Sequence, residues 1–96
     1  VTAVFCANDS LAIGAMRAAR RHHLSIPRDM SIIGFDDIDV ARELITPLTT
    51  VRQPMEQLGE TAARLLLEQP AEAQDIAFIP ELIIRESTAP PRQPVN

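Results

Sequence analysis

The stretch AVFCANDSLAIGAMRAARRHHLSIPRDMSIIGFDD, residues 3–37, decides the fold class of this chain. It begins with an apolar run, residues 3–6, which is typical of a short strand covered on both faces. Three polar residues that can cap a helix come next, and apolar residues at helical spacing then predict a helix over residues 10–23. A second apolar run, residues 30–35, predicts another strand. This order indicates two parallel strands joined by a crossover helix.

The rest of the chain continues this alternation of strands and helices. We predict a short helix over residues 40–44, a strand over 48–51, a helix over 54–69, and two strands over 76–79 and 82–84. The pattern predicts an α/β fold with a mostly parallel sheet flanked by helices. Such a layer is thin, so we expect another part of the polypeptide or another subunit to cover part of it. Residues 1–88 form the predicted domain, and the proline-containing segment 89–96 is predicted to be a disordered tail.

Composition excludes several classes of protein. Ninety-six residues, 46% of them hydrophobic, suffice for one small domain with one core. The net charge of −4 argues against a surface built to bind nucleic acid. The one basic cluster lies at the end of the first predicted helix, where cations complement the helix dipole. It consists of Arg17, Arg20, Arg21, His22 and His23.

The single cysteine, Cys6, cannot form an internal disulfide, which is typical of a reducing compartment. We therefore expect a cytoplasmic protein in which Cys6 is a buried, unreactive residue of the first strand. No run approaches the ~20 apolar residues that span a bilayer, so we expect no membrane partner. The chain begins within a predicted strand, and we expect it to be a fragment of a longer protein.

Polar residues follow each of the first three predicted strands. They are Asn8 and Asp9 after the first strand, Asp36 and Asp37 after the second, and Arg52 and Gln53 after the third. Ligands of open α/β sheets bind outside the carboxyl ends of the strands, so these residues are expected to share one rim. A carboxylate acceptor beside amide side chains suits a neutral polyhydroxylated or heterocyclic ligand, whose hydroxyl or N–H groups donate to the carboxylate.

The acids of GFDDID, residues 34–39, have different explanations. Asp36 directly follows an apolar strand and is the predicted ligand acceptor. Asp39 is expected to cap the short helix after it, and Asp9 to be a helix cap or a first-turn acid. Asp37 is left without an assigned role, with a solvated turn residue as one reading.

An enzyme is the main alternative to a binding protein. Asp37-Ile38-Asp39 resembles the Asp-x-Asp loop of haloacid-dehalogenase-like phosphatases, but those enzymes continue to a Thr where this chain has Ala41. They also need a lysine, and the sequence has none. Phosphate-binding loops, a nucleophile elbow and metal-ligand spacings are absent from the sequence as well. We therefore predict no catalytic activity, no cofactor and no metal site.

Three segments together resemble the lac-repressor-type (LacI/GalR) bacterial transcription regulators. They are the segment from Ala3 to Asp39, the run PLTTVRQP at residues 47–54, and ELIIRESTAP at residues 81–90. The resemblance covers nearly the whole chain. It implies the C-terminal subdomain of a periplasmic-binding-protein-like effector domain, belonging to a repressor that binds a sugar, nucleoside or purine effector. The alternative within this fold is a fragment of a periplasmic sugar-binding transport protein.

The resemblance also assigns roles to individual residues. Asn8, Asp36 and Gln53 match positions that contact the effector. The homodimer interface is expected at Leu11, Gly14, Leu44 and Ile45. Gly14 adds a small residue to the first helix, which allows close packing against a neighbour. Operator DNA would be bound only through a helix-turn-helix, which this chain lacks.

Overall fold

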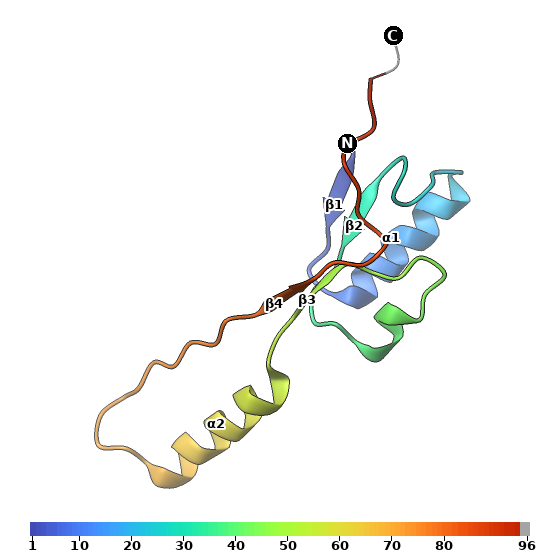
Figure 1. Ribbon diagram of the computed structural model, residues 1–96. Coiled ribbons are helices and arrows are strands. Elements are labelled where there is room, and N and C mark those ends of the chain that lie inside the picture. Colours follow the sequence, from blue (N-terminus) through green and yellow to red (C-terminus); the bar gives the residue numbers. More distant parts are fainter. Residues whose placement is uncertain (95–96) are drawn as a thin grey trace.

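The first two strands form the predicted crossover unit. β1 (Ala3–Phe5) pairs in parallel with β2 (Ser31–Ile33), and α1 (Asp9–Arg21) connects them and lies along one face of the pair (Figure 1). α1 begins after the N-cap residue Asn8 and has basic residues in its last turn, as its sequence predicts. The computed structural model describes residues 1–94.

The third strand extends this unit in two ways. A parallel bridge between Ile33 and Thr49 joins β2 to the segment that enters β3 (Thr50–Arg52). β3 then pairs with β4 (Glu81–Ile83) in antiparallel register. The α/β class is therefore confirmed, with parallel pairing in the first part of the sheet and one antiparallel pair at its end.

A small aliphatic core lies between α1, β2 and the segment before β3. Its buried members are Cys6, Ala12, Ile32, Ala41 and Leu48. Each large apolar side chain buried in this way stabilises the fold by roughly 1.5–3 kcal/mol. The prediction of a buried Cys6 is confirmed, and burial raises the pKa of its thiol above the ordinary value. A thiol that remains protonated is a weak nucleophile.

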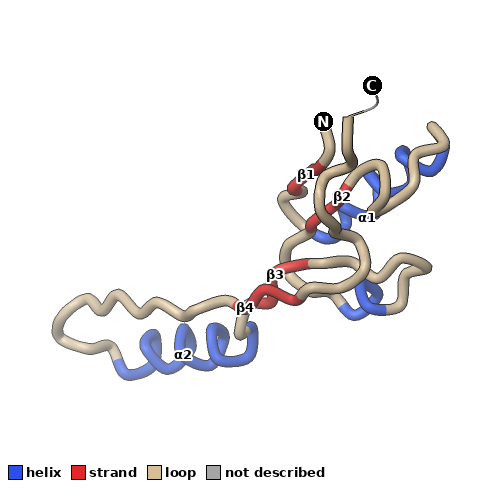
Figure 2. Tube along the Cα trace, turned by 45° about the horizontal axis from the view of Figure 1, so that its top comes forward, coloured by secondary structure: helices blue, strands red, loops and turns tan. Residues whose placement is uncertain are grey.

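The chain divides into a body, residues 1–53 and 81–94, and an arm, residues 54–80. The arm contains α2 (Met55–Glu68) and a return segment, and it projects away from the body (Figures 1 and 2). The radius of gyration is 17.7 Å, whereas a compact chain of this length would have about 12 Å. None of the residues of α2 is buried. The arm therefore stands outside the core of the body.

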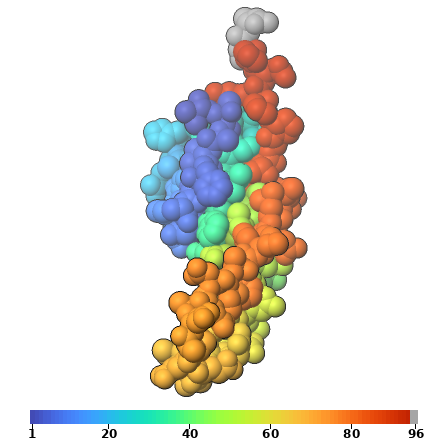
Figure 3. Space-filling view, turned by 90° about the vertical axis from the view of Figure 1, so that its left-hand side faces the viewer, coloured from blue at the N-terminus to red at the C-terminus, as the bar shows by residue number. Residues whose placement is uncertain are grey.

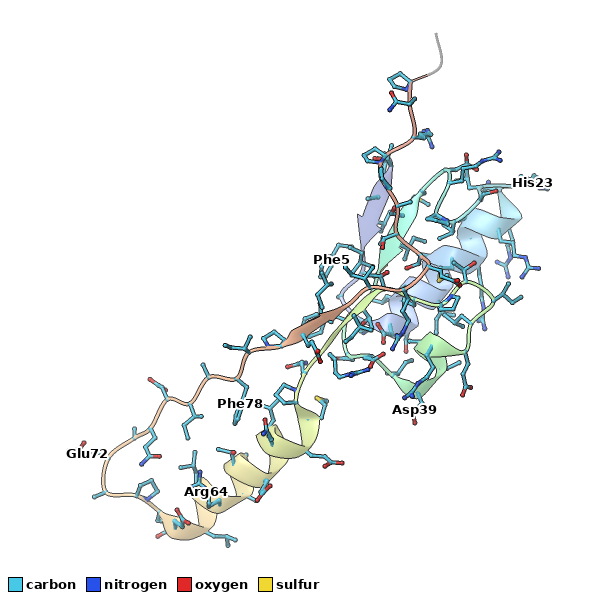
Figure 4. All side chains as sticks on the ribbon, in the orientation of Figure 1. Phe5, His23, Asp39, Arg64, Glu72 and Phe78 are labelled. Carbon is cyan, nitrogen blue, oxygen red and sulfur yellow. The ribbon has the colours of Figure 1, made fainter. Side chains whose placement is uncertain are left out.

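Two predicted elements differ from the structure. No strand forms over residues 76–79, and this segment runs back beside α2 with Phe78 near the helix (Figure 4). A strand needs a hydrogen-bonding neighbour, and the nearest element here is a helix. The short helix predicted over residues 40–44 is a 3₁₀ turn, η1 (Asp39–Arg42). The N–H of Leu48 donates to the carbonyl of Ala41, which draws the following loop back against this turn.

After β4 the chain runs along the open edge of β2 (Figure 3). The N–H of Ile32 donates to the carbonyl of Ser87 (2.9 Å), and the buried Ser87 hydroxyl donates to the carbonyl of Ile32 (2.6 Å). Ala89 exchanges two hydrogen bonds with the hydroxyl of Ser31. Disorder of segment 89–96 stays a prediction, and its last two residues lie outside the described part of the chain.

Candidate functional site

The structure brings the polar residues after β1, β2 and β3 to one edge of the sheet. The N–H of Asp9 donates to the carbonyl of Phe35 (3.0 Å), which joins the ends of β1 and β2. The N–H of Asp36 donates to the carbonyl of Val51 (2.9 Å), which joins the ends of β2 and β3. We call this edge, with Asn8, Asp36 and Gln53, the rim. Asp36 and Gln53 are in contact, and Asn8 directly precedes Asp9, whose N–H joins the end of β1 to Phe35.

Asp36 and Gln53 are in direct contact within the rim. Nε2 of Gln53 donates a hydrogen bond of 3.3 Å to Oδ1 of Asp36, and both residues are half-buried. This bond is long, so a ligand hydroxyl or N–H at 2.7–2.9 Å would compete well for the carboxylate. The pair therefore offers an acceptor and an amide side by side.

Asn8 has a structural role in addition to its predicted one. Its Oδ1 accepts a hydrogen bond from the N–H of Leu11 (2.8 Å), which caps the first turn of α1. The side-chain oxygen is thereby engaged, and the amide nitrogen is the group that suits a ligand acceptor. Contact between Asn8 and an effector stays a prediction.

Asp9 is a support of the rim that its sequence position does not reveal. It lies in the first turn of α1, as expected, but the residue is completely buried. Oδ1 accepts from the hydroxyl of Thr50 (2.6 Å), and Oδ2 accepts from the N–H of Ile38 (2.8 Å). A Cβ at Gly34 would overlap the Asp9 carboxylate, so this position requires glycine for a close approach. Asp9 thus connects α1 with β3 and with the loop after β2.

Asp37 is not a solvated turn residue, and that interpretation is wrong. Its side chain is 4% exposed and lies between two guanidinium groups. Nε of Arg52 donates to Oδ2 at 2.8 Å, and Nη1 of Arg85 lies 2.7 Å from Oδ1. Burial alone would raise the pKa of the Asp37 carboxyl, but Arg85 and Arg52 outweigh it and hold the pKa below its ordinary value. Asp37 is therefore an ionised, paired carboxylate.

The backbone around these acids adopts an uncommon conformation. Asp36 has φ = 111° and Asp37 has φ = 54°, in the region that side-chain-bearing residues rarely occupy. Each such residue costs about 1–3 kcal/mol and persists only where its surroundings fix it. Here three successive N–H groups are held in place, those of Asp36 by Val51, Asp37 by Thr50 and Ile38 by Asp9. The loop that presents Asp36 is thus fixed by β3 and by Asp9.

Asp39 does not cap the turn that follows, which corrects the sequence-based expectation. Ile38 occupies the N-cap position of η1, and no side chain caps it. Asp39 is the first residue of η1 and points outward (Figure 4), and its exposed carboxylate lies 3.5 Å from Arg42. The carboxylate pairs with a charge one turn away because it begins the turn instead of preceding it.

The residues of the predicted dimer interface lie on α1 and on the loop after η1. Leu11 is 56% exposed, Ile45 is 87% exposed, and an added Cβ at Gly14 would meet no atom within 4 Å. A groove of about 400 Å³ separates α1 from this loop. It is lined by Ile13, Met16, Arg17, Arg20, Leu24, Ile26, Leu44, Ile45 and Thr46. Leu44 and Ile45 of the predicted interface line this groove, whereas Leu11 and Gly14 lie on α1 outside its lining.

Within residues 1–94, no group of three side chains is placed to hold a metal ion. No helix in this part of the chain is long and apolar enough to cross a membrane.

The chain matches known proteins over most of its length. Residues 2–88 match the family described as periplasmic binding protein-like domain. The chain is 48% identical to the HTH-type transcriptional regulator MalR of Streptomyces coelicolor, over 92% of this chain. It spans only 27% of the length of that relative.

Two solved structures share this fold. A LacI family transcriptional regulator from Enterococcus faecium with bound ribose is 40% identical over 94% of this chain and 35% of its own, with a TM-score of 0.85. The lac repressor dimer bound to operator and an anti-inducer is 34% identical over 91% of this chain and 32% of its own, with a TM-score of 0.83. The relatives named here are transcriptional regulators, in agreement with the expectation that the chain is not an enzyme.

Proposed function

Because this chain belongs to the LacI family of transcriptional regulators, as part of their periplasmic binding protein-like domain, we propose that it senses an effector and dimerises within a longer DNA-binding repressor. Operator DNA is then bound by a helix-turn-helix elsewhere in that protein. We place the repressor in the cytoplasm, which suits its single reduced thiol.

One observation carries the effector-binding proposal: Asn8, Asp36 and Gln53 follow the carboxyl ends of three neighbouring strands, and Asp36 and Gln53 are in direct contact. The Asp36 carboxylate, with Gln53 beside it, suits a neutral ligand rich in hydroxyl or N–H donors. The sugar, nucleoside and purine classes meet this requirement. Support for a sugar comes from the ribose bound by the Enterococcus faecium regulator.

The arm supports the proposal that the binding cleft is completed by another part of the repressor. α2 and the return segment expose large apolar side chains, among them Leu66, Leu67 and Ile79. Burying apolar side chains of this kind against another element is favourable, because it removes them from water. We assign the arm to contacts with the second subdomain of the repressor, while the body supplies the rim. Effector binding then favours one arrangement of the two subdomains over the other.

Dimerisation is assigned to Leu11, Gly14, Leu44 and Ile45. Leu44 and Ile45 line the apolar groove between α1 and the loop after η1, and Leu11 and Ile45 are more than half exposed. The lac repressor structure is itself a dimer, which supports the assignment. Replacing Ile45 with Asp in the full-length repressor should convert dimers to monomers in light scattering. A dimer that persists with Ile45→Asp would count against this interface.

The effector site is tested in the full-length repressor. A thermal-shift panel of sugars, nucleosides and purines first identifies the compound that stabilises it, and calorimetry then compares variants with that compound. Asp36→Ala should weaken binding at least about tenfold, because a charge-assisted hydrogen bond contributes roughly 1.5–3 kcal/mol. Operator binding should survive. Asp39→Ala, an exposed acid three residues away, is the matched control. Equal affinities for Asp36→Ala and the parent repressor would refute the assignment.

A further inference from the structure

The connection between the body and the arm passes through two strands. β3 leads into the arm after Arg52, and β4 leads out of it from Glu81. They pair with each other in antiparallel register, Val51 opposite Leu82. Among residues 1–94 no other segment of the chain links the two parts. Any movement of the arm relative to the body is therefore transmitted through this ladder.

Asp37 contacts residues of both connecting segments. Arg52 is the last residue of β3, and Arg85 follows β4 by two positions. The Asp37 side chain is 4% exposed and that of Arg85 13% exposed, so their 2.7 Å contact is shielded from water and salt. Arg85 also donates to the carbonyl of Leu48 (3.0 Å), which fixes its guanidinium against the body.

The same residue holds the ligand acceptor in place. Asp37 directly follows Asp36, and both have positive φ. The N–H of Asp37 donates to the hydroxyl of Thr50, and the N–H of Asp36 donates to the carbonyl of Val51. Since Thr50 and Val51 belong to β3, a displacement of this strand also displaces the backbone that presents Asp36.

We propose that Asp37 is a positioning residue that couples the rim to the β3–β4 ladder through Arg52 and Arg85. Asp37 does not contact the effector in this assignment. It fixes the loop that carries Asp36 relative to the two strands that lead to the arm. A buried ion pair suits this role, because in some proteins such pairs fix one geometry while adding little net stability. The inference rests on the proposed function only in calling the rim an effector site.

Native-state hydrogen exchange of the full-length repressor without effector tests the coupling. In Asp37→Asn, the amides of residues 34–38 and of the β3–β4 ladder should exchange about tenfold faster or more, because two charge-assisted contacts are weakened. The amides of Ala12 and Ala19 in α1 should change by less than about twofold. Asp39→Asn is the matched control and should leave all three regions unchanged.

Two arginine variants keep the test decisive if Asp37→Asn does not fold. Arg52→Gln removes a half-exposed partner and should accelerate exchange in the same two segments. Arg85→Lys keeps a positive charge, so its exchange rates in these segments should lie between those of Arg85→Gln and those of the parent protein. Arg64→Gln removes a guanidinium of similar exposure from α2 and should have no effect on the body.

Two outcomes would overturn the proposal. One is unchanged exchange in residues 34–38 and in the ladder when the pairing is removed. The other is equal acceleration in α1, which would make Asp37 a general stabiliser instead of a coupling residue. Because no effector is added, failure here leaves the Asp36 calorimetry intact, and failure of that calorimetry leaves this result intact.

Discussion

The body and the arm each contain one amphipathic helix, and the two helices bury very different amounts of surface. α1 places Asp9, Ala12 and Ala19 fully in the interior, whereas α2 buries none of its residues. Both helices carry apolar residues at helical spacing. The difference teaches that this spacing specifies the face a helix will bury but not the surface that covers it. For α1 the cover is β2, and for α2 we assign it to the second subdomain.

The largest expected difference in stability is between alanine variants of two leucines, Leu48 in the body and Leu67 in the arm. Leu48→Ala should lower the free energy of opening at the Ile32 amide by about 2–5 kcal/mol, because Leu48 is completely buried. Leu67→Ala should change it by less than about 0.5 kcal/mol, since Leu67 is 83% exposed on the arm. Hydrogen exchange of the 96-residue chain measures both values. Similar losses for the two variants would abolish the distinction between body and arm.

The next largest loss of stability is expected for a buried polar residue of the body, Asp9. Asp9→Ala leaves the hydroxyl of Thr50 and the N–H of Ile38 without their acceptor, at a cost of roughly 2–4 kcal/mol. Urea unfolding of the chain, with Asp39→Ala as a control at a fully exposed acid, measures the difference. A loss no greater than that of the control would mean that Asp9 does not support the rim.

Replacing one glycine in the body, Gly34, and one in the arm, Gly59, with alanine should change the stability in opposite directions. Gly34→Ala should destabilise the chain by about 1–3 kcal/mol, because its Cβ would overlap the Asp9 carboxylate and contact Leu48. Gly59→Ala in α2 meets no atom within 4 Å and should increase helix stability by up to about 1 kcal/mol. Thermal unfolding followed by circular dichroism compares the two. Destabilisation by both substitutions would show that α2 is packed more tightly than its exposure indicates.

The smallest effect is confined to acid pH and reports on Asp37. Its pKa is lowered in the folded state, so its pairing contributes stability above the unfolded pKa of about 3.9. This contribution is lost as the pH falls through the lower folded pKa. The difference in unfolding free energy between the parent chain and Asp37→Asn should be constant from pH 7 to about pH 5 and shrink below about pH 4. A difference that grows on acidification would contradict the pairing.

Local patterns suffice for the crossover unit and for the position of the rim. The apolar runs on either side of α1 determine parallel strands whose carboxyl ends must meet, which brings Asp9 beside Phe35. The apolar run over residues 48–51 predicts the third strand, which places Gln53 beside Asp36. Local patterns do not predict the pairing of Asp37 with Arg85, because the whole arm lies between these two residues in the sequence. A strand over residues 76–79 was predicted from β-branched and apolar content alone. Its failure has the same origin, since a strand depends on a partner that local sequence does not specify.

Asp9 shows a second limit of local interpretation. An acid in the first turn of a helix is explained well by the helix dipole, and this explanation holds for many such residues. Here the carboxylate turns inward to Thr50 and Ile38 instead. The nearest sequence signal is Gly34, because a glycine at the end of an apolar strand indicates that another group approaches closely.

The contact of Ser87 with β2 has a consequence for how the protein tolerates proteolysis. Ile32 would otherwise present an unpaired N–H and carbonyl on an apolar strand edge, which is a template for pairing with other chains. Ser87 satisfies both groups at once, one through its backbone and one through its hydroxyl. Ser87 thus covers an exposed strand edge, and cleavage between Arg85 and Ser87 would remove this cover while leaving Asn8, Asp36, Gln53 and the Asp37–Arg85 pair in place. A clipped protein would then be lost through aggregation before any defect in sensing became visible.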